Sequence, residues 1–422
     1  MKLSRILFVI LLINVNCIYG QKKLRTPQQL AKAKVYRSIE EANYSKRTVY
    51  KLNLDGQNLT EIPEDIYSFI NIQELYLRNN KISEIPEEIF NLKNLQKLML
   101  GENNITVVPA SISKLTNLEE LDLFSNNLET LPEAVCNLSK LKSLDIAWNS
   151  ITQLPENIGQ LTNLKQLKAA RNKIHNIPST IGKCINIQEL SLSENQIEYL
   201  PAEIGFLINL PNLDMAKNRL SEVPKEISNL NKLIKINLEN NNLHYISGEA
   251  FALPNLTELI LSGNKITKVT GKFNLPNVEY IDISINKLTS INADFSLCTK
   301  LTRFEAELNL LKAVPDAICQ IPNLRLLNLS RNSIERLESN VTKLQNLEEL
   351  NLNNNKIYSV TKSIGEMSDL KTIKLNNNSI ILLPKQISTL SGLETLYIQN
   401  NKLDNYQKKN VKKYLPNTKI YM

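Results

Sequence analysis

The 422-residue sequence is poor in the residues that carry most catalytic and metal chemistry. It contains five cysteines, two histidines and one tryptophan, and its eleven glycines are scattered along the chain. No G-x-S-x-G, H-E-x-x-H, P-loop or G-x-G-x-x-G motif occurs. The common serine-hydrolase, zinc-protease and nucleotide-binding signatures are therefore excluded, and we expect no cofactor.

Long hydrophobic runs are also missing, except at the start of the chain. Lys2 and Arg5 precede an apolar run over residues 6–15. A charged start followed by a short apolar run is typical of a secretory signal peptide, which we place at residues 1–20. Because ten residues would cross only about half a bilayer as a helix, the run does not predict a transmembrane segment.

Cys17 raises a second form of export, attachment to a membrane through a lipid. Asn16 stands where a lipoprotein signal requires a small or apolar residue, so the pattern favours cleavage without lipid attachment. We therefore expect an exported protein that is secreted, periplasmic or at the cell surface, and lipoprotein anchoring at Cys17 is the less favoured alternative.

The net charge of +8 is confined to the two ends of the chain. Residues 1–20 carry +2, residues 21–50 carry +6 and residues 402–422 carry +5, so residues 51–401 hold a net charge of −5. A protein that grips a polyanion along its length needs a basic stripe on that long middle. The charge distribution therefore argues against nucleic acid as a partner.

One asparagine recurs along the chain at a nearly constant interval. Each step is 23 residues except the step from Asn264 to Asn286, which is 22, and Gln57 occupies the same register one period before the first asparagine. We count sixteen repeat units on this basis. The recurring asparagines, called the ladder asparagines below, are Asn80, Asn103, Asn126, Asn149, Asn172, Asn195, Asn218, Asn241, Asn264, Asn286, Asn309, Asn332, Asn355, Asn378 and Asn401.

Each ladder asparagine lies within a frame of apolar residues. One unit reads Leu95-x-x-Leu98-x-Leu100-x-x-Asn103-x-Ile105 and continues with Pro109-x-x-Ile112-x-x-Leu115. This frame resembles the leucine-rich repeat, L-x-x-L-x-L-x-x-N-x-L, over about residues 50–404. The 23-residue form with L-P-x-x-I looks like that of exported bacterial leucine-rich repeat proteins and of the Ras-group leucine-rich scaffolds, and the signal peptide favours the former.

The resemblance implies an α/β solenoid, a horseshoe with a parallel concave sheet and short helical or 3₁₀ segments on the convex side. The frame has the same consequence on physical grounds, because L-x-L makes a short strand with one inward face and stacked units place such strands about 4.8 Å apart. No unit can bury its core without neighbours. A buried ladder asparagine must find hydrogen-bond partners in the backbone of its own and the adjacent coil.

Ten units place proline six residues after the ladder position, where its fixed φ suits the start of a short helix or 3₁₀ turn. These prolines are absent between Ser247 and Asn292, and we expect a local change of curvature there. The ten are Pro63, Pro86, Pro109, Pro132, Pro155, Pro178, Pro201, Pro224, Pro315 and Pro384.

No Pro/Gly/Ser-rich stretch marks a domain boundary, so we expect one elongated solenoid over residues 51–404. Its open ends need covering. Residues 21–50 are predicted to form an N-terminal cap in which Ser38-x-x-Glu41 makes a capping box, and residues 405–422 a C-terminal cap that begins with a Lys-rich helix.

The four cysteines after residue 20 fall at positions that favour packing over chemistry. Cys184 and Cys298 occupy frame positions where leucine is expected, and Cys136 and Cys319 lie on the outer turn beside the core. Among them only Cys298 and Cys319, in adjacent coils, are placed to form a disulfide, and the sequence leaves open whether they do. His175 and His244 lie three coils apart, about 14 Å, and cannot share a zinc ion, so no metal site is expected.

Two carboxylates suggest an enzyme as one alternative. Asp122 and Asp145 share a column of adjacent strands, so their carboxyl groups approach within about 5 Å, a separation used in glycoside hydrolysis. The sheet of such a solenoid is shallow and open to water, and no base or metal motif accompanies the pair. We therefore do not expect catalysis.

The same columns hold aromatic and other large apolar side chains that the register directs to solvent, and these are candidate binding anchors. The resemblance implies protein–protein recognition in an envelope, surface or secreted setting, and we place the binding site on the concave face. The alternatives are a carbohydrate-binding surface protein, a cytoplasmic signalling scaffold and a glycosidase-like enzyme. The candidate ligand-binding residues are Tyr76, Arg78, Met99, Glu120, Asp122, Phe124, Asp145 and Trp148.

Overall fold

The computed structural model describes residues 24–422. The predicted signal peptide, Cys17 and the first three residues of the predicted N-terminal cap lie outside this range. The chain divides into two units, of which the first ends at Ser191 and the second comprises Leu192–Met422. In the described range no helix is long and apolar enough to cross a membrane.

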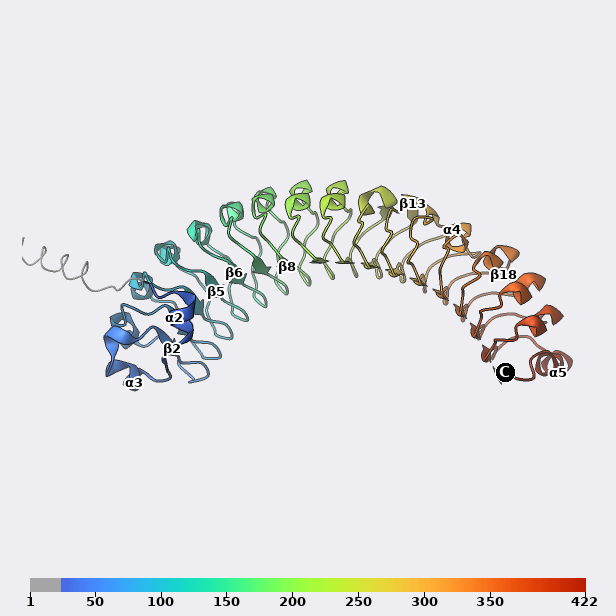
Figure 1. Ribbon diagram of the computed structural model, residues 1–422, viewed down its shortest axis with the longest axis horizontal. Coiled ribbons are helices and arrows are strands. Elements are labelled where there is room, and N and C mark those ends of the chain that lie inside the picture. Colours follow the sequence, from blue (N-terminus) through green and yellow to red (C-terminus); the bar gives the residue numbers. More distant parts are fainter. Residues whose placement is uncertain (1–23) are drawn as a thin grey trace, which may run out of the picture. The chain divides into compact units, whose positions relative to one another are not determined.

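The first unit is built on one parallel sheet with one three-residue strand in each repeat (Figure 1). From β2 to β8, each strand pairs with the strand of the next coil in a register of 23 residues, so that Leu98 lies beside Leu121 and Leu121 beside Leu144. These leucines are fully buried, as the L-x-L frame predicts. The strands are β1 (Val35–Tyr36), β2 (Lys51–Asn53), β3 (Glu74–Tyr76), β4 (Lys97–Met99), β5 (Glu120–Asp122), β6 (Ser143–Asp145), β7 (Gln166–Lys168) and β8 (Glu189–Ser191).

Short 3₁₀ helices lie on the side of each coil opposite the strand (Figure 1). In most coils the proline six residues after the ladder position directly precedes the helix, as Pro109 does at η4. The proline is therefore the N-cap residue, whereas the sequence predicted it in the first turn of the helix. The isoleucine of P-x-x-I, Ile112 in this coil, is fully buried. The helices of the first unit are η2 (Glu64–Ser68), η3 (Glu87–Asn91), η4 (Ala110–Lys114), η5 (Glu133–Asn137), η6 (Ile158–Gln160) and η7 (Ser179–Lys183).

The second unit has the same plan, so the predicted solenoid with a parallel sheet and short 3₁₀ segments is confirmed in both units. Its main sheet consists of β9 (Asn212–Asp214), β10 (Lys235–Asn237), β12 (Glu258–Ile260), β14 (Tyr280–Asp282), β16 (Arg303–Glu305), β17 (Leu326–Asn328), β19 (Glu349–Asn351), β21 (Thr372–Lys374), β22 (Thr395–Tyr397) and β23 (Lys419–Tyr421). Its short helices are η8 (Ala202–Phe206), η9 (Lys225–Asn229), η10 (Gly248–Phe251), α4 (Asp316–Cys319), η11 (Ser339–Lys343), η12 (Lys362–Glu366) and η13 (Lys385–Thr389).

Coils without the proline form additional small sheets in the second unit. Strands β11 (Tyr245–Ser247), β13 (Lys268–Lys272) and β15 (Asn292–Asp294) make one parallel sheet, and β18 (Arg336–Leu337) and β20 (Ser359–Val360) make another. Thr361, at the proline register, donates its N–H to the carbonyl of Leu337 at 2.9 Å. Proline has no N–H to donate, so the additional strands form where the proline is missing. The predicted change of curvature in this stretch stays a prediction.

Aromatic side chains fill the core beside the first of these additional sheets. Phe251, Phe273 and Phe295 stack in succession with ring centroids 6.3 and 4.8 Å apart, and Phe304 meets Phe295 edge-on at 5.6 Å. All four are buried. Aromatic packing thus replaces the usual aliphatic contacts where the outer turn changes.

The ladder asparagines connect neighbouring coils through their amides. Asn126 donates to the carbonyls of Leu100, in the preceding coil, and Leu123, in its own, at 3.0 and 3.1 Å. Its carbonyl oxygen accepts the N–H of Ile105 at 2.9 Å. The predicted pairing with the backbone of both coils is confirmed. Both the donor and the acceptor of the buried amide are hydrogen-bonded.

The residue before each ladder asparagine adopts the left-handed conformation. Asparagine occupies this position in several coils, for example Asn79 with φ of 51° and Asn240 with φ of 56°. Trp148, Ile285 and Leu308 occupy it elsewhere with φ between 55° and 57°. Asparagine tolerates this conformation, whereas bulky and β-branched residues do so at a cost.

The N-terminal end begins with α2 (Pro27–Ala31), α3 (Ile39–Asn43) and the 3₁₀ helix η1 (Lys46–Thr48). Ser38 accepts the N–H of Glu41, which is half of the predicted capping box, but the Glu41 carboxylate accepts the N–H of Arg37 instead of that of Ser38. At α2, Thr26 and Gln29 form the reciprocal box.

At the C-terminal end, helix α5 (Asn405–Tyr414) begins where the Lys-rich helix was predicted. Asp404 accepts the N–H of Gln407 at 2.7 Å and caps its first turn. Strand β23 follows, pairs with β22, and places Tyr421 in a parallel stack on Tyr397 with ring centroids 4.7 Å apart. Helix α5 and strand β23 therefore follow the last repeat strand, β22, at the end of the second unit.

Cys136, Cys184, Cys298 and Cys319 are buried and free, so Cys298 and Cys319 are not bridged. Burial raises the pKa of the Cys184 thiol to about 11 and that of the Cys298 thiol to about 12. The predicted core role of Cys184 and Cys298 is confirmed.

Candidate functional site

The eight predicted ligand-binding residues come from β3, β4, β5, β6 and the turns that follow these strands. Tyr76, Met99, Asp122 and Asp145 end the four strands and are paired in register from one strand to the next. We call the full set of eight the N-terminal sheet patch. Its members are Tyr76, Arg78, Met99, Glu120, Asp122, Phe124, Asp145 and Trp148.

Two residues of the N-terminal sheet patch are less accessible than the register predicted. The prediction of solvent-exposed side chains is wrong for Met99, which is 8% exposed, and for Asp122, which is 5% exposed. Met99 lies between Tyr76 and Asp122 in the strand-end column, and strands about 4.8 Å apart let neighbouring side chains cover one another. Register determines the face of the sheet, but the neighbours determine the exposure.

Arg78 covers the carboxylate of Asp122. Its guanidinium forms an ion pair and a charge-assisted hydrogen bond with Asp122 Oδ2, although the two residues belong to coils that are not adjacent. Asp122 Oδ1 accepts the N–H of Phe124 at 2.9 Å. Both carboxylate oxygens of Asp122 therefore have partners within the protein.

Tyr76 and Glu120 are held by partners along the same strands. The Tyr76 hydroxyl donates to Glu74 Oε2 at 3.0 Å, and Glu74 pairs with Lys51 at 3.1 Å. Burial, and then the Glu74 charge, raise the pKa of Tyr76 well above its usual value. Glu120 pairs with Lys97 at 2.6 Å, so Glu120 adds little net charge to the surface.

Asp145 is the carboxylate of the N-terminal sheet patch that lacks a basic partner. Its Oδ1 accepts the N–H of Ala147 at 3.1 Å, and no ion pair engages it among the described residues. Burial, followed by the neighbouring charge of Asp122, raises the pKa of Asp145. The two aspartates are adjacent as predicted, but Arg78 occupies one of them, so they are not a free carboxylate pair.

Trp148 is the most exposed apolar side chain of the N-terminal sheet patch, with 50% of its surface accessible. Phe124 meets its indole edge-on with ring centroids 6.4 Å apart and an interplanar angle of 65°. The guanidinium carbon of Arg171 lies 3.9 Å from the indole centroid. The indole is therefore held between an aromatic edge and a cation, an arrangement that fixes its orientation.

A small hollow opens beside these rings. It has a volume of about 290 Å³. Gly101 lacks a side chain on this wall, and a Cβ placed there would lie 3.0 Å from both oxygens of Asp122. The hollow is lined by Arg78, Gly101, Glu102, Asp122, Phe124 and Asp145.

Comparison with known families identifies the repeats directly. The family profile described as leucine rich repeat matches residues 70–128, 208–266 and 345–403. A profile for two copies of the repeat matches residues 254–304, and a single-repeat profile matches residues 140–161. The chain belongs to the leucine-rich repeat family. No match is found among curated proteins.

Solved leucine-rich repeat structures resemble this chain over most of its length. A leucine-rich repeat protein of Leptospira interrogans is 32% identical, covers 92% of this chain and 100% of its own, and superposes with a TM-score of 0.70. The plant peptide hormone receptor RGFR1, solved in complex with RGF2, is 25% identical over 92% of this chain and 69% of its own, with a TM-score of 0.65. InlJ of Listeria monocytogenes shares the fold at 19% identity over 84% of this chain and 74% of its own, with a TM-score of 0.56.

Two features of this leucine-rich repeat surface were not predicted. Arg171 follows Trp148 by one period, and this spacing is the signal by which it could have been found. Glycine stands in the column of Arg78 and Phe124 only at Gly101, and this exception marks the hollow.

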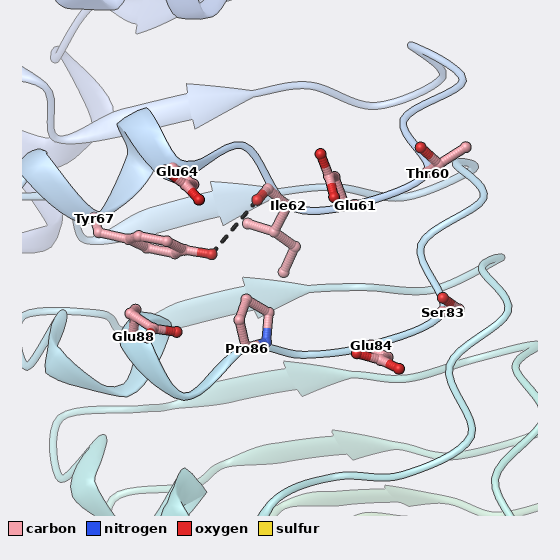
Figure 2. Close-up of a pocket in the computed structure, with 9 residues that line it drawn as sticks. All are labelled: Thr60, Glu61, Ile62, Glu64, Tyr67, Ser83, Glu84, Pro86 and Glu88. Carbon is pink, nitrogen blue, oxygen red and sulfur yellow. Dashed lines mark hydrogen bonds between the residues drawn. The ribbon is translucent and has the colours of Figure 1, made fainter.

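A second hollow, of about 660 Å³, is lined by residues of the two segments that follow β2 and β3 (Figure 2). The ring of Tyr67 projects into it, and its hydroxyl donates to the carbonyl of Ile62 at 3.5 Å. Burial, and then the charge of Glu88, raise the pKa of Tyr67. The residues that line this hollow are Thr60, Glu61, Ile62, Glu64, Tyr67, Ser83, Glu84, Pro86 and Glu88.

No group of three His, Cys, Asp or Glu side chains among residues 24–422 is arranged to hold a metal ion.

Proposed function

We propose that this leucine-rich repeat protein is exported and binds a protein partner through the N-terminal sheet patch. Leucine-rich repeat solenoids generally act as extended binding surfaces, and RGFR1 is a relative solved with a peptide hormone. The patch combines tryptophan, tyrosine and arginine, the residues that most often anchor protein interfaces. Its mechanism is therefore recognition, with Trp148 as the main contact.

The conformation of Trp148 is the observation that carries the proposal. Its φ of 57° costs free energy for a bulky side chain, and half of its surface stays in water. Asparagine fills the same position in coils such as that of Asn79, so folding does not require tryptophan there. Costly residues that give little burial are typical of functional sites. Ile285 and Leu308 share this conformation, but of the three only Trp148 is an aromatic ring, with Phe124 and Arg171 packed on it.

The orientation of the indole supports the same function. Phe124 and Arg171 hold it before any partner arrives, so little side-chain entropy is lost on binding. Asp122 is already neutralised by Arg78, which spares the partner the cost of burying an unpaired charge at that point. The surface is therefore organised in advance for contact.

Carbohydrate recognition is the second candidate function, because an exposed indole beside a carboxylate also suits a sugar ring. Asp145, at the end of β6, and Trp148, in the turn that follows it, provide this pair within one coil. The purified chain and Trp148→Ala can be compared on a glycan array. A glycan that binds the parent but not the variant would favour carbohydrate recognition over a protein partner.

The test of the main proposal compares variants in a pull-down. The tagged chain from Gln21 onward and two variants, Trp148→Ala and Ile285→Ala, are incubated with extract and the bound proteins are identified by mass spectrometry. Ile285 occupies the same left-handed position in another coil and is a matched control. We expect a protein that binds the parent and Ile285→Ala but not Trp148→Ala. Equal binding by all three would refute the role of the patch.

Export rests on the charged start and apolar run of residues 1–20. We expect a mature N-terminus at or near Gln21 in the secreted, periplasmic or surface fraction. An acylated Cys17 would show the lipoprotein form instead. An intact Met1 terminus on cytoplasmic protein would overturn export and revive the signalling-scaffold alternative.

A further inference from the structure

The hollow beside Trp148 has an uncompensated charge. Three carboxylates and one guanidinium line it, from Glu102, Asp122, Asp145 and Arg78. The Arg78 guanidinium forms its ion pair with Asp122 and none with the other two carboxylates. Lys168 ends the next strand beside Asp145, but its ammonium pairs with Glu189 at 3.4 Å. The lining groups therefore sum to a charge of −2, and Lys168 and Arg78 offset part of the charge on Asp145 without forming an ion pair with it.

The shape and the lining of the hollow also restrict which ligand can enter it. Phe124 forms one side, and it connects the hollow to the indole of Trp148. The volume of about 290 Å³ lies just below the range of about 300–1,000 Å³ that is typical of pockets for whole small molecules. Gly101 leaves room on one wall for the Asp122 carboxylate, because a Cβ at this position would lie 3.0 Å from both carboxylate oxygens. One side chain of a larger ligand fits this space better than a free ligand does.

We infer that the hollow receives a lysine or arginine side chain of the protein partner, with its charged end at Asp145 and its methylene stem along Phe124 and Trp148. This inference rests on the proposed function and states the chemistry of the partner. A cation at Asp145 compensates the carboxylate that the protein itself leaves unpaired. The apolar stem of a long basic side chain packs against aromatic rings while its head reaches the charge.

Asp145→Asn tests the charge without disturbing the turn. The Asp145 carboxylate accepts the N–H of Ala147, and asparagine accepts the equivalent N–H in other coils, as Asn237 does from Glu239 at 3.1 Å. The local structure of the strand end is therefore preserved in the variant. Asp214→Asn is the matched control, because Asp214 accepts the N–H of Ala216 at 3.1 Å and does not line the hollow.

The experiment uses a random dodecapeptide display library selected on the immobilised chain from Gln21 onward. Enriched peptides are synthesised, and their affinities for the parent, Asp145→Asn, Asp214→Asn and Trp148→Ala are measured by fluorescence anisotropy. We expect the enriched peptides to share a lysine or arginine, and replacing it by glutamine to weaken binding at least about ten-fold. Asp145→Asn should cause a similar loss and Asp214→Asn none.

The outcomes separate the two proposals. Peptides that need Trp148 but bind Asp145→Asn as tightly as the parent, or that share no basic residue, would overturn the inference and leave the proposed function intact. Peptides that bind Trp148→Ala as tightly as the parent would overturn both the inference and the proposed function. A selection in which no peptide is enriched on the parent relative to Trp148→Ala would have the same consequence.

Discussion

Arg78 reaches Asp122 across the intervening coil. In that coil, Gly101 occupies the position that corresponds to Arg78. The guanidinium pairs with Asp122 Oδ2, and the two residues are 44 positions apart in sequence. The absence of a side chain at Gly101 leaves room for the Asp122 carboxylate, since a Cβ there would meet it at 3.0 Å. One glycine thus permits an ion pair between non-adjacent coils.

Gly101→Ala tests this relationship. The backbone of Gly101 is not left-handed, so alanine is accommodated by the chain, but its methyl group displaces Asp122. We expect a loss of about 1–3 kcal/mol in the free energy of unfolding, measured by urea denaturation. Ser193→Ala, in the same column of another coil, should change it by less than about 0.5 kcal/mol. A Gly101→Ala protein as stable as the parent would show that Asp122 moves without cost.

Trp148 should be dispensable for folding and necessary for binding. We expect Trp148→Ala to weaken partner binding by about 1–2 kcal/mol, as for an aromatic anchor, measured by calorimetry with the identified partner. Trp148→Asn should keep or raise the melting temperature, because asparagine suits the φ of 57°. If both variants are recovered only as aggregates, the indole is structural and the assignment fails.

Leu144, in the same coil as Trp148, should behave in the opposite way. It is fully buried, so Leu144→Ala should leave a cavity and cost about 2–5 kcal/mol in the free energy of unfolding. Ser143→Ala, at a partly exposed position of β6, serves as the control and should have little effect in the same urea titration. A small loss for Leu144→Ala would mean that the coil collapses around the missing side chain.

The ladder amide of Asn126 cannot be replaced by a residue of similar size. Asn126→Leu leaves the carbonyls of Leu100 and Leu123 and the N–H of Ile105 without their partner. We expect a loss of about 3 kcal/mol or more, visible as a lower melting temperature in calorimetry. Asn127→Leu, at the exposed neighbouring position, should not reproduce it. Equal melting temperatures for the two variants would contradict the role of the amide.

The buried thiols predict a dependence of stability on alkaline pH. Burial raises the pKa of Cys184 to about 11 and of Cys319 to about 12, from an ordinary value of 9.0. Stability is full below pH 9, where the thiols are protonated in both states, and falls as pH rises from 9 toward 12, because the unfolded chain ionises first. A variant with alanine at all four cysteines should show a shallower fall between these pH values in thermal scans.

Thiol titration checks the state of the same cysteines. In the unreduced chain from Gln21 onward, which holds four of the five cysteines, Ellman's reagent should detect four thiols after denaturation and far fewer before it, since all four are buried and free. Detection of two thiols or fewer in the denatured protein would require a disulfide that the structure lacks.

Much of the fold was predictable because the repeat imposes it. The leucines of L-x-L must point inward, and a slip of one residue would turn the whole apolar set to solvent, so the register of Leu98, Leu121 and Leu144 follows from the 23-residue period. The absence of proline at Thr361 is visible in the sequence, but its effect, an added strand pairing through the free N–H, was not predicted.

The face of the sheet on which each residue of the N-terminal sheet patch lies follows from the repeat pattern, because strand side chains alternate and the period places them in columns. The contacts among these side chains became known from the folded chain. Met99 became buried between its neighbours, Arg78 passed Gly101 to reach Asp122, and Arg171 came to lie on Trp148. These contacts depend on side-chain rotamers and on the space left by residues in other coils, and a repeat frame specifies the backbone positions but not that space.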